Sequence, residues 1–378
     1  MSLHKCKLGE LITQRREKNK DNNLPISGVS KEGLIPPKQK DADISLYNVF
    51  YYGDFIFNPA RMELNSIAYN DKFEKAICSS LYEVFYVNRN EIILPEYLAL
   101  IVKQDWFTRY CEFLGQGSAR EYCRFANISE IEIEFPDIET QKKIVHCYQI
   151  IRRRIALKQK INDNLAETEQ AILKETTSSE DTSIIYLGDI VDFIDGDRGK
   201  NYPTYDEFTK EGYCLFLNAS NVTGIGFDFS DCMFITKDKD ELMNKGHLER
   251  FDIVLTSRGT LGNVALYNNY IPYENVRINS GMLIIRSKSD KIQAYYLYAL
   301  LKSYYMKSAI EQYRSGSAQP QLPIKDLQKI SFNIPTSESV LEKLNSDFRR
   351  IENTISQNSN EISNLKALQS VFLSELSR

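Results

Sequence analysis

The stretch GSAQPQLPIKDLQKISFNIP at residues 316–335 repeats the pattern of GSAREYCRFANISEIEIEFP at residues 117–136. Both stretches begin with Gly-Ser-Ala, carry aliphatic residues at the same interior positions (Ile128 and Leu327, for example) and end in proline, 199 residues apart throughout. Solenoid repeats have periods of roughly 20–50 residues. The much longer spacing here therefore indicates that a whole domain has been duplicated.

Further matches extend the duplication toward the start of each half. The matched segments are Lys7–Leu11 with Tyr186–Ile190, Asp54–Ile56 with Asp252–Val254, Arg61 with Arg258, Ile67–Ala68 with Val264–Ala265, and Tyr97–Leu98 with Tyr296–Leu297. The separation is 179 residues for the first pair and 197 to 199 for the others. The second copy is therefore expected to carry an insertion of about 20 residues after its first matched block.

A long helix-forming segment follows each copy. In the second, apolar residues alternate three and four apart, which is the spacing of a coiled-coil seam. This seam consists of Leu341, Leu344, Phe348, Ile351, Ile355, Ile362, Leu365, Phe372 and Leu376. The first copy has a weaker seam at Ile144, Tyr148, Ile151, Ile155, Leu165 and Ile172.

Polar residues interrupt both seams, at Lys158, Asn162 and Asn358. Such residues weaken a coiled coil but can fix its register. At about 1.5 Å per residue, each helix is expected to be on the order of 50–60 Å long. We expect the two helices to pair in antiparallel fashion; two long core helices of a bundle are the alternative.

The pattern predicts an α+β chain with two similar mixed α/β domains, each followed by a long helix. The expected boundaries are residues 1–136 for the first domain, 137–175 for the first helix, 176–183 for a polar linker, 184–335 for the second domain and 336–378 for the second helix. Runs rich in β-branched and aromatic residues predict strands at Tyr47–Tyr52, Leu215–Leu217, Ile253–Leu255, Val264–Leu266 and Gly281–Ile285. Residues Ala294–Leu301 predict an amphipathic helix whose tyrosines pack in the interior.

Bulk composition fits two ordinary globular domains. The chain has 378 residues, of which 42% are hydrophobic and 26% charged, and this length exceeds one comfortable core. No apolar run reaches the roughly 18 residues of a transmembrane helix, and the polar start Met1–Cys6 lacks a signal-peptide core. The seven cysteines include no CxxC pair, which favours reduced thiols over a disulfide or zinc framework. We therefore expect a cytoplasmic protein without a membrane segment.

Few motifs in the sequence indicate catalysis. The three histidines lack the spacing of metal ligands, and the sequence contains no P-loop. Asn58–Arg61 is only distantly similar to the Asn-Pro-Pro-aromatic motif of adenine methyltransferases, because the second proline and the aromatic residue are missing. Asp137 is better explained as the N-cap of the first long helix than as part of a nuclease motif. These features favour a non-catalytic protein that holds no metal or cofactor.

The order of the motifs, which occur twice with long helices between them, resembles the specificity subunits of type I restriction–modification systems over essentially the whole chain. The motifs that carry the resemblance are Leu8-Gly9 and Leu187-Gly188, the two Gly-Ser-Ala loops, the runs Ile131–Pro136 and Ile330–Pro335, and Glu139–Ile144 at a helix start. The first copy departs from the second in its loop, where Arg120 and Tyr122 stand in place of Gln319 and Gln321.

The resemblance implies a non-catalytic subunit that recognises double-stranded DNA. Each of two target-recognition domains would read one half of an asymmetric, bipartite target, and the helices would set the distance between the halves. The resemblance also implies two methyltransferase subunits docked on the helices, which would hold S-adenosylmethionine, and restriction–translocase subunits that join them. A second hypothesis, supported by the net charge of -4, is a protein-interaction scaffold with the same architecture and no sequence-specific DNA recognition.

Side chains suited to base edges or phosphates gather in the predicted loops of both halves. The candidates in the first half are Arg15, Arg16, Lys18, Ser27, Lys31, Arg61, Ser118 and Arg120. Those in the second half are Arg198, Lys200, Asn201, Asn218, Asn221, Arg258, Thr260, Ser317, Gln319 and Gln321. Each would also suit a solvated loop or a local turn, and a structural salt bridge to a carboxylate is an equal explanation for Arg61 and Arg258.

Overall fold

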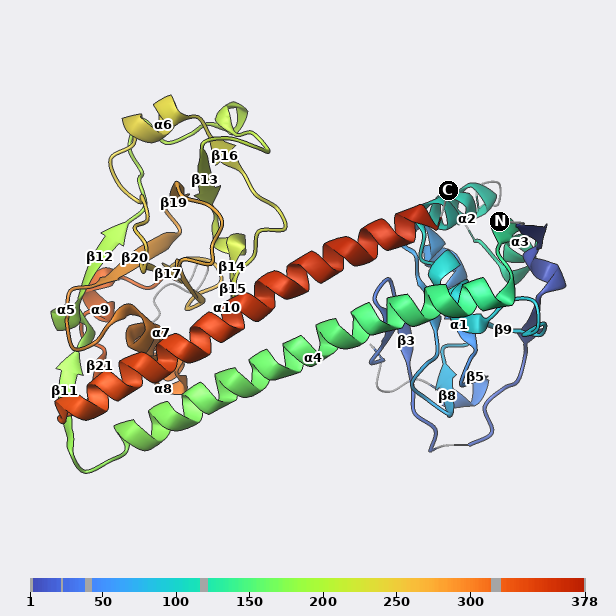
Figure 1. Cartoon of the computed structure of the whole chain (residues 1–378), viewed down its shortest axis with the longest axis horizontal. Helices are drawn as coiled ribbons and strands as arrows, with labels where there is room; N and C mark the ends of the chain where they lie inside the picture. Colours follow the sequence, from blue (N-terminus) through green and yellow to red (C-terminus); the bar gives the residue numbers. More distant parts are fainter. Residues whose placement is uncertain (1–2, 22, 38–42, 116–121, 314–320, 377–378) are drawn as a thin grey trace. The chain divides into compact units, whose positions relative to one another are not determined.

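The computed structural model describes residues 3–21, 23–37, 43–115, 122–313 and 321–376 of the chain. It contains two compact units (Figure 1). The first unit comprises Met1–Ala156 with Ser363–Arg378, and the second comprises Leu157–Ile362. Each unit therefore holds one copy of the duplicated sequence together with parts of both long helices.

The first unit is built around an antiparallel sheet with the strand order β2-β9-β6-β7. Its strands are β1 (His4–Lys7), β2 (Ile12–Arg15), β3 (Gly28–Ser30), β4 (Gly33–Ile35), β5 (Asn48–Tyr51), β6 (Phe55–Phe57), β7 (Ile67–Tyr69), β8 (Lys75–Cys78), β9 (Glu83–Val87) and β10 (Glu132–Phe135). Its helices are α1 (Pro95–Ile101), α2 (Asp105–Gly115), α3 (Phe125–Ser129) and the first part of α4 (Ile138–Thr177). The unit also contains three separate two-stranded antiparallel pairs, which are β1–β10, β3–β4 and β5–β8.

The second unit has an antiparallel sheet with the order β12-β20-β17-β18. Its strands are β11 (Thr182–Tyr186), β12 (Val191–Asp195), β13 (Cys214–Leu217), β14 (Val222–Thr223), β15 (Gly226–Phe227), β16 (Phe234–Ile235), β17 (Ile253–Thr256), β18 (Val264–Leu266), β19 (Val276–Ile278), β20 (Met282–Ser287) and β21 (Ser331–Pro335). Its helices are α5 (Leu187–Ile190), α6 (Lys237–Leu242), α7 (Ala294–Lys302), α8 (Tyr304–Tyr313), α9 (Ile324–Leu327) and most of α10 (Glu338–Glu375).

The two units share one fold, which confirms the predicted duplication. The order β2-β9-β6-β7 corresponds to β12-β20-β17-β18, and the outer pair β1–β10 corresponds to β11–β21. Equivalent backbone hydrogen bonds recur, for example from Leu8 N–H to Ile131 O (2.9 Å) and from Leu187 N–H to Ile330 O (2.7 Å). The five predicted strands and the predicted helix α7 are present, with small shifts at their ends.

The extra residues of the second copy lie between β12 and β17. That interval contains β13, the hairpin β14–β15, β16 and α6, where the described residues of the first unit form β3, β4, a short 3₁₀ helix (Ile44–Leu46) and β5. A parallel strand pairing is nevertheless present at the same place in both units. Strand β13 pairs with β19 in parallel, and Ile26 forms the corresponding parallel bridge to Ile77 of β8. The insertion therefore lengthens loops around an unchanged centre.

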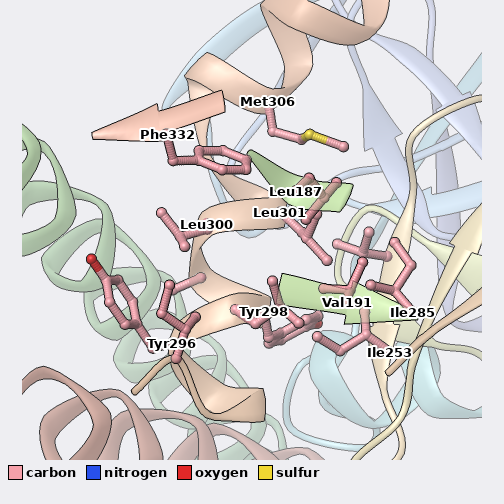
Figure 2. Close-up of a cluster of buried hydrophobic side chains, with 14 of the residues drawn as sticks. Leu187, Val191, Ile253, Ile285, Tyr296, Tyr298, Leu300, Leu301, Met306 and Phe332 are labelled. Atoms are coloured by element: carbon pink, nitrogen blue, oxygen red, sulfur yellow. The ribbon is translucent and has the colours of Figure 1, made fainter. Parts of the chain in front are cut away.

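Each unit has its own hydrophobic core. In the first, the buried rings of Phe55 and Phe85 stack with their centroids 4.9 Å apart. In the second, α7 packs on the sheet and on the long helices. Figure 2 shows its residues Tyr298 and Leu301 beside Val191 of the sheet. Three of the tyrosines on α7 are buried, as predicted for packing residues.

Helices α4 and α10 pack against each other in opposite directions within each unit, which confirms the antiparallel prediction. In the second unit, Lys158 of α4 contacts Asn358 and Glu361 of α10. In the first unit, the ring of Tyr148 on α4 lies 6.2 Å from that of Phe372 on α10. Residue numbers along α10 therefore increase as those of their partners on α4 decrease, which means that the helices run antiparallel. The predicted seam residues are buried or half-buried.

The polar interruptions of the seam pair with one another. The Asn358 side-chain amide donates to Asn162 Oδ1 (2.8 Å), and Lys158 Nζ donates to Asn358 Oδ1 (2.8 Å). Both asparagines are buried. A buried polar group that loses its partner costs about 1–3 kcal/mol. Sliding the helices by one turn would separate these groups, so the layer favours a single register.

A buried ionic cluster joins α7 to both long helices in the second unit. Lys302 Nζ lies 3.0 Å from Glu169 Oε2 on α4 and 2.5 Å from Glu352 Oε1 on α10. The ring of Tyr298 lies 4.6 Å from the same ammonium group. Burial raises the pKa of Glu169 to about 8, although Lys302 opposes the shift. One cation therefore holds two carboxylates, one of which favours its protonated form.

This cluster predicts that stability falls as the pH rises from about 5 to about 8. Glu169 keeps its proton in the folded state but loses it near pH 4.5 when unfolded, because its folded pKa is raised. The folded state then binds more protons, and the free energy of unfolding decreases by up to about 1.4 kcal/mol per pH unit. Glu169→Gln should flatten this dependence in urea unfolding curves measured across that range. An unchanged slope in Glu169→Gln would contradict the assignment.

Candidate functional site

In the second unit, one end of the four-stranded sheet gathers loops from distant parts of the sequence. The strand register places Asp195 of β12 beside Leu283, and Thr256 of β17 beside Met282. The loops after β12 and β17 and the turn before β20 therefore meet at this end. We call this surface the second sheet end. Its residues are 196–202, 257–260, 279–281 and 321. Gln321 pairs with Arg258 through its backbone, in an isolated antiparallel β-bridge.

The turn at residues 279–281 holds these loops together. Its carbonyl oxygens accept hydrogen bonds from the Arg198 guanidinium (3.3 Å) and from the backbone N–H groups of Ser257 (2.9 Å) and Arg258 (3.1 Å). Gly196 approaches the Asn279 carbonyl so closely that an added Cβ would overlap it. Glycine is therefore required for the loop after β12 to reach the turn.

Six of the predicted DNA-binding residues lie on the second sheet end with part of their side chains accessible, among them the exposed Gln321 and the half-buried Asn201. Lys200 and Thr260 are exposed, and Arg258 is half-buried. Arg198 is 46% exposed while it pairs with Asp195 (3.0 Å). Among the residues that the structure describes, no carboxylate pairs with Arg258. The salt-bridge explanation is therefore not supported for this arginine.

The predicted asparagines of the second half are engaged in local structure. Asn221 is 3% exposed and donates to two carbonyl groups of loop 228–231 (3.0 Å each). The amide of Asn201 donates to a backbone carbonyl (2.8 Å). Asn218 Oδ1 accepts from a backbone N–H two residues later (2.8 Å) and caps a short 3₁₀ helix. Because Asn221 is buried, the contact set proposed below excludes it.

In the first unit, the corresponding end of the sheet carries a pocket of about 540 Å³. We call it the first sheet end. The hairpin β3–β4, the start of the 3₁₀ helix η3 (Pro59–Leu64) and the turn before β9 contribute to it. Its polar lining is Ser27, Ser30, Lys31, Tyr47, Asn58, Arg61, Ser66, Ser79 and Tyr82. Arg61 has no ionic partner within the described part of the chain, so a salt bridge is not supported here either.

Lys103 fastens the hairpin that carries Lys31. Its Nζ donates to the carbonyl oxygens of Lys31 (2.8 Å) and Ile67 (2.7 Å) and to Asn65 Oδ1 (3.1 Å). Burial lowers the pKa of Lys103 to about 8. The backbone position of Lys31 is therefore set by a buried ammonium group, while the Lys31 side chain stays exposed.

The remaining candidates of the first half lie in and after β2. Arg15 pairs with the buried Asp54 (2.6 Å) and lies 4.7 Å from the ring centroids of Tyr51 and Tyr86. It therefore stabilises the fold. Arg16 and Lys18 are exposed in the segment that leaves β2 at the first sheet end.

Ser118, Arg120, Ser317 and Gln319 lie outside the described residues. The chain that follows each of these pairs docks in an equivalent way. Cys123 N–H donates to Pro59 O, and Leu322 N–H donates to Ser257 O, both at 3.0 Å. The two acceptors lie directly after the central strands β6 and β17.

Several residues of these surfaces were missed by the sequence analysis. Asn58 and Tyr82 line the pocket of the first sheet end, and the turn 279–281 organises the second. Lys103 and Lys302 were also missed, although they stand 199 residues apart, in the turn after α1 and at the end of the matching helix α7. A search for charged residues at the repeat offset would have found this pair. Nothing in the sequence marks Asn58 or Tyr82 as neighbours of Lys31.

Both sheet ends, within the described ranges of the chain, offer hydrogen-bond donors and acceptors. No three histidine, cysteine or acidic side chains there approach closely enough to hold a metal ion. No helix in those ranges combines the length and apolarity needed to cross a bilayer. Guanidinium, ammonium, amide and hydroxyl groups are the side chains that contact phosphates and base edges.

A family profile described as "Type I restriction modification DNA specificity domain" matches residues 6–167 and, a second time, residues 179–364. The two matches cover most of the chain and follow its two copies. The chain belongs to this family. In this DNA-specificity chain, each family repeat contains one of the two four-stranded sheets and one sheet end.

Individual proteins of known type are similar to this DNA-specificity chain. The type I restriction enzyme MjaIX specificity subunit of Methanocaldococcus jannaschii is 23% identical over 305 residues, covering 75% of this chain and 68% of that protein. The HindI specificity subunit of Haemophilus influenzae is 26% identical over 125 residues, which is 32% of this chain and 27% of that protein. The crystal structure of a type I restriction–modification S subunit from M. genitalium matches with a TM-score of 0.64 and 17% identity, over 99% of this chain and 96% of that one. The last comparison shows a shared fold.

The two repeats of the DNA-specificity chain present unlike side chains on equivalent surfaces. The first sheet end has Lys31 and Arg61 beside a pocket. The second has Arg198 and Arg258 around a turn, with Gln321 alongside. The backbone frame and the matched arginines Arg61 and Arg258 are therefore repeated, while the other exposed side chains of the two sheet ends differ.

Proposed function

We propose that this chain is the sequence-specific DNA-recognition subunit of a type I restriction–modification complex and that it reads an asymmetric, bipartite target in double-stranded DNA. The observation that carries the proposal is the pair of equivalent sheet ends with unlike donors. One backbone frame would dock both surfaces in a similar way, and different side chains would select different base sequences. The chain itself is a non-catalytic targeting subunit.

The proposed contact residues divide between the two half-sites. Those of the first are Arg16, Lys18, Lys31, Arg61, Ser118 and Arg120. Those of the second are Arg198, Lys200, Asn201, Asn218, Arg258, Thr260, Ser317, Gln319 and Gln321. Arginine reads guanine through a bidentate contact, and lysine and exposed hydroxyl groups suit phosphates.

The proposed partners supply what this chain lacks. Two methyltransferase subunits would dock on α4 and α10 and bring S-adenosylmethionine, and restriction–translocase subunits would join them in the cytoplasm. The net charge of -4 favours DNA binding by the complex, because affinity for DNA depends on the phosphates that basic residues neutralise. The lengths of α4 and α10 would set the spacing between the half-sites, since each base pair adds about 3.4 Å along the duplex.

The experiment that tests this function is selection of bound duplexes from a random library. The chain is purified with its methyltransferase subunits, and bound DNA is sequenced at moderate salt. We expect two defined blocks of bases separated by a spacer of fixed length and free sequence. Bound DNA without any enriched sequence would overturn the proposal and favour the scaffold hypothesis. A single enriched block would contradict the bipartite reading.

Arg258→Ala is expected to weaken recognition of only one half-site. Loss of a base-reading arginine costs about 1–3 kcal/mol and relaxes specificity at that position. The measurement repeats the selection with the variant complex and compares base frequencies in both blocks. Arg61→Ala should relax the other block. Arg89→Ala, an arginine whose side chain is 51% exposed between β9 and α1, is the control and should change neither. Equal relaxation of both blocks by Arg258→Ala would contradict the assignment.

A further inference from the structure

In both units, one side-chain amide of the long helix binds the backbone of the segment directly before α1 or α7. We call this arrangement the clamp. In the first unit, Gln141 of α4 is 0% exposed. Its Oε1 accepts from Leu94 N–H (2.9 Å), and its Nε2 donates to Ile92 O (2.9 Å). The same Nε2 donates to Pro136 O (2.8 Å). The Gln141 amide therefore links α4 to Pro136, which follows β10, and to the two residues Ile92 and Leu94 before α1.

In the second unit, Asn345 of α10 makes the equivalent bridge. Its Oδ1 accepts from Gln293 N–H (3.0 Å), and its Nδ2 donates to Lys291 O (2.8 Å). Lys291 and Gln293 stand directly before α7, as Ile92 and Leu94 stand directly before α1. The same two backbone groups are thus bound by one side-chain amide in both units (α1, α4, α7 and α10 are labelled in Figure 1).

The two amides occupy different positions in their helices. Gln141 lies in the first turn of α4, whereas Asn345 lies one turn further into α10. The repeat offset would pair Gln141 with Val340, so a sequence comparison does not reveal the correspondence. Different residues at different helix turns make the same hydrogen bonds in the two units. The clamp is therefore a feature of the fold and was not inherited by duplication of a single residue.

The clamp gives each domain a second, directional attachment to its long helix. The first attachment is the covalent passage from β10 to α4, or from β21 to α10. Apolar contacts nearby tolerate small rotations because hydrophobic attraction has no direction, whereas hydrogen bonds weaken steeply when they are bent. A tilt of about 5° would move the far end of a helix on the order of 60 Å long by roughly 5 Å, more than one base-pair step of about 3.4 Å.

We propose that Gln141 and Asn345 are positioning residues that fix the angle of each recognition domain on its long helix and thereby make the complex select one spacer length. This inference rests on the proposed function. The residues touch no DNA. They act through the backbone before α1 and α7, so their loss leaves the base-reading surfaces intact and broadens the range of spacers that is accepted.

The test uses the complex with its methyltransferase subunits and a set of duplexes carrying the selected half-sites. The spacers in this set are one to three base pairs shorter or longer than the selected one. For Gln141→Met and Asn345→Leu, which remove the bonds and nearly keep the volume, we expect the preference for the selected spacer to fall roughly fivefold to tenfold. The base preferences within each half-site should stay unchanged. Gln328→Met after α9 and Asn90→Leu between β9 and α1, both at exposed positions outside the long helices, are the matched controls.

The outcomes separate this inference from the function on which it rests. If the wild-type complex prefers no spacer because it selects no bipartite sequence, the proposed function fails. If the wild type selects a bipartite target and both variants keep its spacer preference, the clamp inference fails. A uniform loss of affinity for all spacers would indicate only lost stability and would also count against it.

Hydrogen exchange of the wild-type complex keeps the inference testable even if the variants do not fold. The backbone amides of Leu94 and Gln293 should exchange as slowly as amides in the central strands β6 and β17, because the clamp is their acceptor. Exchange at the rate of an open loop would overturn the inference without any substitution.

Discussion

Lys302→Met is expected to lower the free energy of unfolding by about 3–5 kcal/mol at neutral pH, because removing one member of a buried ionic cluster leaves a buried charge without compensation. The two carboxylates that Lys302 joins belong to Glu169 and Glu352, whose side chains are 0% and 6% exposed. Methionine retains the apolar stem of the lysine, so the loss reports on charge far more than on packing.

Chemical unfolding followed by circular dichroism at about pH 7 and about pH 5 measures this effect. The loss should shrink at the lower pH, because burial without a compensating cation favours the protonated, uncharged form of a carboxylic acid. The double variant Lys302→Met/Glu352→Gln should recover much of the stability. Lys103→Met is the matched control from the other unit, since Lys103 contacts only carbonyl and amide oxygens. Equal losses at the two pH values would contradict the charge argument.

Phe85→Ala is expected to destabilise the first unit by about 3–5 kcal/mol, through lost apolar burial and the cavity that remains. Phe85 is 0% exposed at the centre of the sheet. Its ring stacks on that of Phe55 at 4.9 Å and lies 6.0 Å from the rings of Phe57 and Phe125. Aromatic pairs of this kind add about 0.5–1.5 kcal/mol beyond the buried area.

The single tryptophan of the chain provides a local probe for this prediction. Trp106 lies on α2 of the first unit and packs against the core that contains Phe85. Its fluorescence should show an unfolding transition at lower denaturant concentration in Phe85→Ala, and Phe85→Leu should fall between the variant and the wild type. In DNA selection near the transition, the block read by the first unit should weaken before the other. A transition that does not move would contradict the proposed core.

Two of the residues predicted to contact DNA, Arg15 and Asn221, make structural contacts within the fold. Arg15 has a sequence context like that of Arg16, yet the structure pairs Arg15 with Asp54 inside the first unit. In the second unit the equivalent Asp252 takes its arginine from another strand, at Arg286. A short sequence window cannot predict which arginine a buried carboxylate will bind, because the choice depends on which strands become neighbours.

The duplication, the long antiparallel helices and the polar residues in their seam could all be predicted from the amino-acid sequence, because periodicity and repeated spacing are properties of the chain read in order. The three-dimensional fold was needed to show which loops meet at each sheet end and that Lys103 and Lys302 bind different partners. It was also needed to show that Gln141 and Asn345 bind the same backbone groups from different turns of their helices. The physical reason is that these contacts join residues far apart in the chain. Their geometry follows from strand order and helix packing, and a linear pattern does not record either.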